Sequence, residues 1–168
     1  YYKGSHRAKQ LYNMAIASLQ AERQLKQPTL LEQAKEASLI DISLPDIKGK
    51  QQKLSDLKGK VVLLDFTAYQ TDYSPEYNIL LAKIYKQFRD KGFEIYQVSL
   101  DNNENFWKVS ASNLPWICVR DEASIYSTVA NLYNVKNLPS AFLIDRTGAI
   151  QKRIASIESI SGEIQKLL

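Results

Sequence analysis

The sequence has almost no cysteine and almost no histidine, and these shortages exclude several kinds of chemistry. Cys118 is the single cysteine among 168 residues, so neither a disulfide within the chain nor a cysteine-based metal site can form. His6 is the single histidine and lies far from Cys118 in the sequence. A catalytic cysteine–histidine pair is therefore not expected. We expect Cys118 to be a packed thiol in a buried strand, and we expect no metal and no cofactor.

Long apolar runs are also missing, and charge of one sign is not concentrated anywhere. No apolar stretch approaches the length that is needed to cross a bilayer, so we expect no membrane span. The formal net charge is +4, but lysine and arginine are interleaved with aspartate and glutamate along the whole chain. That pattern is typical of solvated helix faces. The sequence therefore predicts no nucleic-acid partner.

Apolar side chains recur at three- and four-residue spacing over residues 7–25, which predicts an amphipathic helix. We interpret residues 1–36 as a helical connector from an upstream domain and residues 37–168 as the main domain. The apolar stripe must pack on this domain or on a second copy of the chain, so a homodimer stays open. A membrane-surface helix is disfavoured because the polar face is not strongly basic. Because the chain starts at Tyr1, we expect a processed product or an excised fragment.

From Ala37 onward the pattern alternates between strands and helices. A hairpin is predicted around residues 45–50, and the unbroken apolar run of residues 61–66 suits a central strand that is covered on both faces. Ser74 is the expected N-cap of the next helix, with Pro75 in its first helical position and Gly92 after its end. Further strands and helices follow, and a hairpin and a helix close the chain. This order predicts an α/β fold with a mixed central sheet between helical layers.

Several short motifs occur in an order that is typical of one superfamily. They are Leu44-Pro45-Asp46, Leu54-Ser55-Asp56-Leu57-Lys58-Gly59-Lys60, Lys91-Gly92-Phe93-Glu94-Ile95, Val98-Ser99-Leu100-Asp101, Leu114-Pro115-Trp116, Tyr133-Asn134-Val135 and Leu138-Pro139-Ser140-Ala141-Phe142. Over residues 37–168 the chain resembles the thioredoxin superfamily, most closely the TlpA-like and ResA-like, AhpC/TSA-related thiol–disulfide oxidoreductases common in Bacteroidetes. The resemblance implies a thioredoxin-like three-layer fold with an N-terminal β-hairpin. It also implies an extracytoplasmic location, in the periplasm or cell envelope.

The chemistry of that family needs two cysteines separated by two residues at a helix N-terminus. The backbone amides and the helix dipole there stabilise the nucleophilic thiolate, and the second thiol resolves the mixed disulfide. Thr71 and Ser74 align with this pair, and Asp72 and Tyr73 align with the residues between them. A hydroxyl group has no disulfide chemistry. Thiol–disulfide exchange is therefore excluded at these positions, and we assign no catalytic residue.

Pro139 aligns with the cis-proline of the superfamily, which faces the redox pair and presents backbone groups to an extended peptide. The resemblance implies that Leu138 has a free edge for strand-like pairing with a ligand. Asp65 aligns with a buried acid, which we expect here as a hydrogen-bonded buried carboxylate. We expect Tyr73 on the surface, whereas core packing and surface contact are equally open for Tyr69. The candidates for binding a peptide or another ligand are Tyr69, Asp72, Tyr73, Leu138 and Pro139.

Two functions remain open at this point. The favoured hypothesis is a redox-inactive thioredoxin-fold module of a cell-envelope protein, which binds an extended peptide or protein at the Pro139 face or has an architectural role. It is favoured because the scaffold is retained while the reactive pair is replaced. The alternative is an enzyme. That enzyme would be a thiol–disulfide oxidoreductase that works through Cys118 or a partner thiol, or it would use a different chemistry based on Asp65 and the tyrosines.

Overall fold

The computed structural model describes Asn13, Ile16 and residues 40–168; the rest of the expected connector lies outside the described residues. The order of elements follows the alternation of strands and helices that the sequence predicts. In chain order they are β1 (Ser43–Pro45), β2 (Gln51–Lys53), the 3-10 helix η1 (Leu54–Leu57), β3 (Val61–Thr67), α3 (Ser74–Phe88), η2 (Arg89–Lys91), β4 (Phe93–Ser99), α4 (Glu104–Ala111), β5 (Ile117–Arg120), η3 (Ser124–Tyr126), α5 (Thr128–Leu132), β6 (Ser140–Ile144), β7 (Ile150–Ile154), η4 (Ile157–Ser159) and α6 (Ile160–Leu167).

A mixed five-stranded sheet forms the centre of the described domain, in the order β5-β4-β3-β6-β7. Strands β3, β4 and β5 are parallel, whereas β6 is antiparallel to both β3 and β7. Strand β3 is buried at every position, which confirms the central place that its unbroken apolar run predicts. The predicted N-terminal hairpin is confirmed by the antiparallel pairing of β1 with β2.

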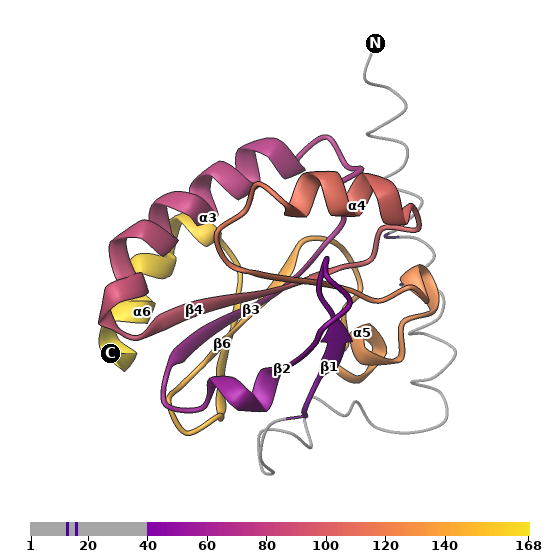
Figure 1. Ribbon diagram of the computed structural model, residues 1–168. Coiled ribbons are helices and arrows are strands. Elements are labelled where there is room, and N and C mark those ends of the chain that lie inside the picture. The colour runs from indigo at the N-terminus through magenta and orange to yellow at the C-terminus, as the bar shows by residue number, and fades with distance from the viewer. Residues whose placement is uncertain (1–12, 14–15, 17–39) are drawn as a thin grey trace.

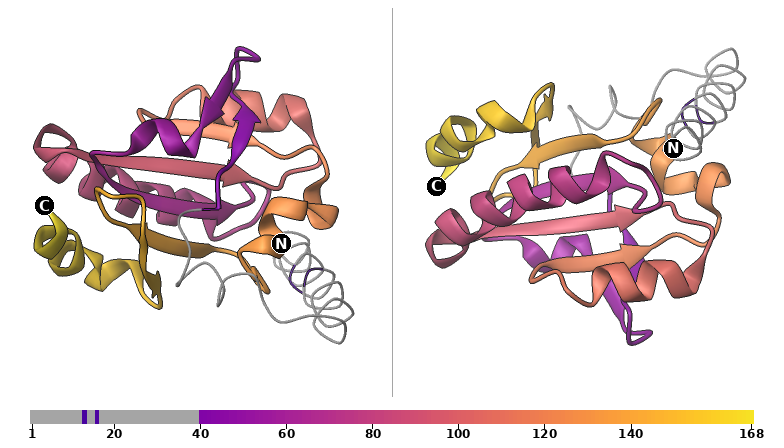
Figure 2. Two further views of the ribbon diagram at one scale, coloured as in Figure 1. Left: turned by 90° about the horizontal axis from the view of Figure 1, so that it is seen from below. Right: turned by 90° about the horizontal axis from the view of Figure 1, so that it is seen from above.

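Alternate side chains of β3 point into two hydrophobic cores, one on each face of the sheet. Val61 and Leu63 pack in a cluster with residues of α3, α4 and α6. Val62 and Leu64 pack in a second cluster with residues of the hairpin region, η1 and α5. Figure 1 shows α3 and α4 above the sheet and α5 and the hairpin below it, and Figure 2 shows the same layers from below and from above. The thioredoxin-like three-layer arrangement is confirmed.

The second cluster also contains Ile16, one of the two described residues that precede residue 40. Ile16 is 3% exposed and belongs to the cluster that includes Phe66, Leu138 and Phe142. The rings of Phe66 and Phe142 meet edge to face, with centroids 6.2 Å apart. At least this part of the predicted apolar stripe therefore packs on the domain of its own chain. None of the helices within the described part of the chain is long and apolar enough to span a bilayer.

Two local predictions differ from the structure. Ser74 does not cap α3: Tyr73 occupies the N-cap position, and no side chain makes a capping hydrogen bond there. Ser74 is already the first helical residue, so Pro75 is the second and not the first as expected. Ser74 Oγ accepts a hydrogen bond from Asn78 Nδ2 at 3.4 Å. The expected stop after this helix is confirmed, because Gly92 has a φ of 93°, in the left-handed region that favours glycine.

Candidate functional site

The Leu138–Pro139 loop lies at the end of β3 from which the chain turns into α3. In the antiparallel register of β3 and β6, Phe66 pairs with Ser140. Pro139 precedes Ser140 directly, so it lies next to the carboxyl end of β3, where the 68–73 turn begins. The Leu138–Pro139 peptide bond is cis. The fold thus brings together two of the segments that the sequence singles out, the turn that contains Thr71 and the proline loop.

The two hydroxyl residues that stand at the aligned redox positions are both buried. Thr71 and Ser74 are each 3% exposed. Thr71 Oγ1 donates a hydrogen bond to the carbonyl oxygen of Ala68 at 2.6 Å, and the backbone N–H of Ser74 donates to the carbonyl oxygen of Thr71 at 3.3 Å. Asp72, between them, is exposed. These hydroxyls therefore hold the turn together and present no reactive group to solvent.

Tyr73 is half-buried, so the expectation that it lies on the surface is only partly correct. Its hydroxyl is 2.8 Å from Thr67 Oγ1 and accepts a hydrogen bond from the backbone N–H of Ala68 at 3.4 Å. Burial raises the pKa of the Tyr73 hydroxyl above its usual value. The ring meets that of Tyr77 edge to face at 5.8 Å between centroids. Much of Tyr73 therefore supports the turn, and only part of its ring is open to a ligand.

Asp101, which follows β4, fixes the start of the turn and was not among the predicted site residues. Its carboxylate accepts hydrogen bonds from the backbone N–H groups of Tyr69 at 2.8 Å and Gln70 at 3.0 Å. Ser99 Oγ donates to the same carboxylate at 2.5 Å. Burial raises the pKa of Asp101, and the bonds from Ser99, Tyr69 and Gln70 oppose that rise. The sequence signal that could have identified Asp101 is its place just after a strand that runs parallel to β3.

Asp65 is the buried carboxylate that the sequence predicts, and it belongs to a hydrogen-bonded network. It is 0% exposed. Tyr77 of α3 donates to its Oδ1 at 2.5 Å, and Gln97 Nε2 of β4 donates to its Oδ2 at 2.9 Å. Burial raises the pKa of Asp65 to about 6, while the bonds from Tyr77 and Gln97 act in the opposite direction. The carboxyl therefore ties the central strand to its neighbouring strand and to the covering helix.

Gln97 joins this network to the tyrosine of the turn, and sequence reasoning missed it. Its Oε1 accepts hydrogen bonds from the Tyr69 hydroxyl at 2.6 Å and from Trp116 Nε1 at 2.9 Å. Tyr69 is 5% exposed, which decides the open question in favour of core packing. Tyr69 is thereby removed from the surface candidates, because its ring and its hydroxyl are both enclosed. A lone glutamine inside an apolar strand was the only signal for Gln97.

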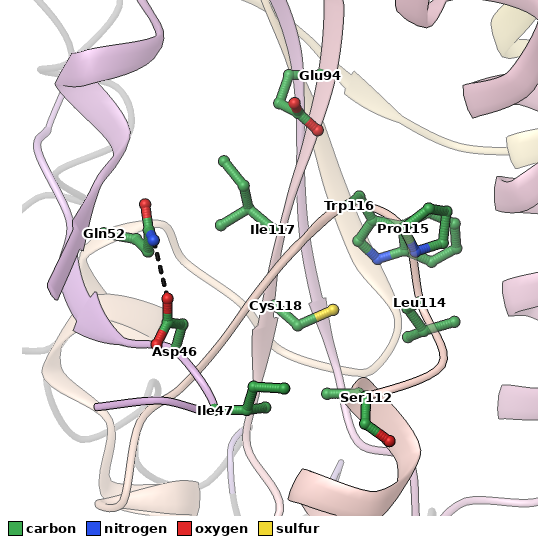
Figure 3. A pocket seen from close by; sticks show the side chains of 11 residues that line it. Asp46, Ile47, Gln52, Glu94, Ser112, Leu114, Pro115, Trp116, Ile117 and Cys118 are labelled. Carbon is green, nitrogen blue, oxygen red and sulfur yellow. Dashed lines mark hydrogen bonds between the residues drawn. The ribbon is translucent and has the colours of Figure 1, made fainter. Parts of the chain in front are cut away.

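Cys118 lies on β5, on the opposite side of β3 from the proline loop in the order of strands. It is 7% exposed, and burial raises the pKa of its thiol to about 12. The thiol lines a pocket of about 280 Å³ whose wall also includes Asp46, Glu94 and Trp116. Figure 3 shows this pocket, with Asp46 bonded to Gln52 across from the cysteine. The predicted packed thiol is confirmed. Its Sγ lies 3.9 Å from Gln97 Oε1, which also accepts the hydrogen bond from Tyr69, and β4 and β3 separate its strand from the proline loop.

The expected free edge at Leu138 is wrong. The backbone N–H of Leu138 donates a hydrogen bond to Asn13 Oδ1 at 2.7 Å, so the N-terminal segment already satisfies it. The Leu138 side chain is 2% exposed and packs in the same cluster as Ile16. A ligand strand that pairs with this N–H would have to displace Asn13. Pro139, in contrast, is half-buried and lines a surface pocket.

Known sequences and structures that are similar to this chain support the thioredoxin-like fold described above. The sequence model described as AhpC/TSA family matches residues 36–153. Thiol-disulfide oxidoreductase ResA from Bacillus cereus is 30% identical over 129 residues, which cover 73% of this chain and 72% of the relative. ResA from Bacillus subtilis is 34% identical over 113 residues, which cover 65% of this chain and 60% of the relative.

Two solved structures from Bacteroides species are similar in both sequence and fold. A thioredoxin-like protein from Bacteroides vulgatus is 51% identical, with a TM-score of 0.73 over 78% of this chain and 86% of that one. A thiol-disulfide oxidoreductase from Bacteroides fragilis is 30% identical, with a TM-score of 0.71 over 78% of this chain and 99% of that one. Both structures thus share the fold of this chain over 78% of its length.

The raised pKa of Asp65 predicts a specific dependence of stability on pH. The folded protein holds the Asp65 proton up to about pH 6, above the usual carboxyl pKa of 3.8. This carboxyl therefore favours the folded state most below the unfolded-state pKa, and that contribution is lost as the pH rises through about 6. From about pH 4.5 to about pH 7.5, we expect the unfolding free energy of the wild type to fall by about 2 kcal/mol relative to Asp65→Asn. Urea denaturation at each pH measures it.

Asp56→Asn is the matched control for this prediction, because it makes the same change at an exposed carboxyl. We expect the difference between wild type and Asp56→Asn to change little over the same range. If the difference in unfolding free energy between wild type and Asp65→Asn stays constant with pH, the raised pKa of Asp65 is contradicted.

The contact between Asn13 and the proline loop predicts a change in hydrogen exchange. In Asn13→Ala the Leu138 N–H loses its acceptor, so we expect its exchange to be about five- to tenfold faster, as suits the loss of one hydrogen bond. Amide exchange followed by NMR on the whole chain measures this rate. Asn102→Ala makes the same change at an exposed position and is the control. Equal Leu138 exchange rates in the two variants would show that Asn13 does not protect this amide.

Proposed function

We propose that this chain, which belongs to the AhpC/TSA family, is a non-catalytic thioredoxin-fold module that binds an extended peptide or protein partner at the Pro139 face. Its main part is a TlpA/ResA-like domain of the thioredoxin superfamily. One observation carries the proposal: hydroxyl residues stand at both aligned redox positions, and both are buried and hydrogen-bonded within the protein. Electron transfer through sulfur needs thiols that solvent and substrate can reach.

The surroundings of these residues support a structural use of the former active-site elements. In a redox enzyme of this fold, a buried acid next to the cysteines has a proton to exchange with them. Here Asp65 is bonded to Tyr77 and Gln97, and the Thr71 hydroxyl is bonded to a backbone carbonyl group. These polar groups are satisfied by one another, as buried polar groups must be for stability.

The binding surface that we propose is the Pro139 side of the loop. The Leu138 N–H is bonded to Asn13, so simple strand addition at Leu138 is blocked unless the N-terminal segment moves. The exposed Asp72 and the accessible part of Tyr73 belong to the turn next to this loop and are the remaining candidates from the sequence. A partner that lies across Pro139 would contact them without displacing Asn13.

We further propose that the chain works outside the cytoplasm, as part of a cell-envelope protein with an upstream domain. Relatives at 30% identity or more are named thiol-disulfide oxidoreductases, and disulfide chemistry belongs mainly to oxidising compartments. A module that has lost its thiols while it keeps the scaffold is well suited to a role in recognition there.

The alternative is a thiol–disulfide oxidoreductase that acts through Cys118 or a partner thiol. Its support is the printed activity of the relatives and the pocket that the Cys118 thiol lines. Against it stand the burial of the thiol and its pKa of about 12, since the thiolate is the reactive form. Two measurements separate the proposals.

The first measurement is an insulin-reduction assay with dithiothreitol as the electron donor. We expect insulin to be reduced no faster with the wild type present than by dithiothreitol alone, because no thiol stands at Thr71 or Ser74. We expect the double variant Thr71→Cys, Ser74→Cys to exceed that rate, since a backbone hydrogen bond already joins these two residues across the turn. Thr71→Cys alone is the control for an added, unpaired thiol. Wild-type turnover above the reagent rate would refute the non-catalytic proposal.

The second measurement is the labelling rate of Cys118 with a chromogenic disulfide reagent. Because the thiol is 7% exposed and has a raised pKa, we expect labelling at about pH 8 to be at least about a hundredfold slower in the native protein than in urea. The unfolded chain provides the reference rate for the same thiol. Comparable rates in the two states would favour the oxidoreductase alternative.

A further inference from the structure

Beside Pro139 the surface is hollowed into a pocket of about 480 Å³. It is formed by the loop between α5 and β6 together with the end of the edge strand β7. Its lining residues are Asn134, Lys136, Asn137, Pro139, Ser140, Arg153, Ile154 and Ala155. We call this the α5–β6 pocket. Because Pro139 is one of its walls, a ligand that lies on the proline face extends directly into it.

The described residues that line the α5–β6 pocket carry charge of one sign. Lys136 and Arg153 contribute two cations, and none of the other described lining residues has a carboxylate. Within the described residues neither cation has an ion-pair partner, whereas the neighbouring Lys152 pairs with Glu163 at 3.4 Å. Asn137 adds a side-chain amide to the same wall. Such a lining has hydrogen-bond donors in excess and suits an anionic group.

The guanidinium group of Arg153 is held in place before any ligand arrives. It lies over the ring of Phe142, at 5.0 Å from the centroid, and Phe142 is the cross-strand partner of Arg153 in the β6–β7 pair. Its Nη1 and Nη2 donate to the carbonyl oxygen of Asn134 at 3.2 and 3.1 Å. Nη2 also donates to Ser140 Oγ at 3.4 Å, so three of the five N–H donors are engaged by described residues and two can reach a ligand. Because the planar group is already oriented, less side-chain entropy is lost on binding.

We propose that the α5–β6 pocket is a carboxylate-binding subsite, which takes the side-chain carboxylate of an aspartate or glutamate in a peptide held at Pro139. The peptide part of this inference rests on the proposed function of the Pro139 face. The carboxylate part stands on the lining of the pocket alone. The subsite makes the module selective for acidic segments, which the backbone contacts of a proline loop cannot do.

Lys152 provides a matched control for Arg153 within the same strand. Successive residues of a strand point to opposite faces of the sheet. Arg153 lies over Phe142, which belongs to the cluster with α5, whereas Lys152 reaches Glu163 of α6 on the other face. Arg153→Gln and Lys152→Gln therefore remove the same charge from adjacent positions, and only the first removes it from the pocket.

The test is an NMR titration of the ¹⁵N-labelled whole chain with two blocked peptides, acetyl-Ala-Ala-Glu-Ala-Ala-amide and its glutamine counterpart. We expect the glutamate peptide to bind about fivefold more tightly at low salt, with the largest shifts at the amides of Lys136, Asn137, Ser140 and Arg153. We expect this preference to shrink at high salt, because the ionic interaction is screened. Arg153→Gln and Lys136→Gln should each reduce it, while Lys152→Gln should keep it.

Two further probes identify the source of the carboxylate. They are N-acetylglutamate amide, which has no flanking residues, and acetyl-pentaalanine with a free carboxyl terminus. Tighter binding of the terminal carboxylate than of the glutamate peptide would overturn the side-chain assignment. Binding of N-acetylglutamate amide at the pocket, with no additional shifts from either peptide at the amides of Asp72 and Tyr73, would support the carboxylate subsite and overturn the peptide role of Pro139.

The remaining outcomes separate this inference from the proposed function. Equal affinities of the glutamate and glutamine peptides, with shifts at the amides of Asp72 and Tyr73, would overturn the carboxylate subsite and leave peptide binding at Pro139 in place. A glutamate preference that persists in both Arg153→Gln and Lys136→Gln would also overturn the subsite. Far-ultraviolet circular dichroism of each variant checks that the fold is unchanged.

Discussion

The buried carboxylate of Asp65 is the constraint on which the rest of the site depends. An ionisable group that is 0% exposed in the central strand destabilises the fold unless hydrogen bonds compensate it. Tyr77 from the covering helix and Gln97 from the adjacent strand provide those bonds. Gln97 in turn accepts from Tyr69, so the turn after β3 is joined to the same network. The carboxyl therefore positions the elements that would carry a redox site.

The turn after β3 is held by hydrogen bonds within the protein. Thr71 and Ser74, which the resemblance aligns with the family's redox pair, carry hydroxyls that are hydrogen-bonded to Ala68 and Asn78. Asp101 binds the backbone of the turn from the next strand, so the turn is stable without a disulfide. Loss of thiols from such a site removes the reaction but leaves a shaped surface. A scaffold that needs no cysteine for its own stability can be reused for recognition.

The two sides of the proline loop differ in what they offer to a partner. On the Leu138 side the backbone donor is bonded to Asn13, and Ile16 packs into the core beneath. On the Pro139 side Lys136 and Arg153 line a pocket to which no described residue contributes a carboxylate. Asn13 therefore limits strand pairing on one side, while a lysine and an arginine side chain mark the other. The partner that we propose approaches across Pro139 and carries an acidic side chain.

Hydrophobic periodicity by itself determined the order of elements, the central place of β3 and the burial of Cys118, because the spacing of apolar residues follows the geometry of helices and strands. The cysteine count by itself removed disulfide chemistry from Thr71 and Ser74. Only the tertiary structure decided that Gln97 and Asp101 hydrogen-bond to the turn after β3 and that the Tyr69 side chain is buried in the core. It also decided that Asn13 accepts the hydrogen bond from the Leu138 N–H. The physical reason is that each of these depends on hydrogen bonds between residues distant in sequence, whose partners no local pattern specifies.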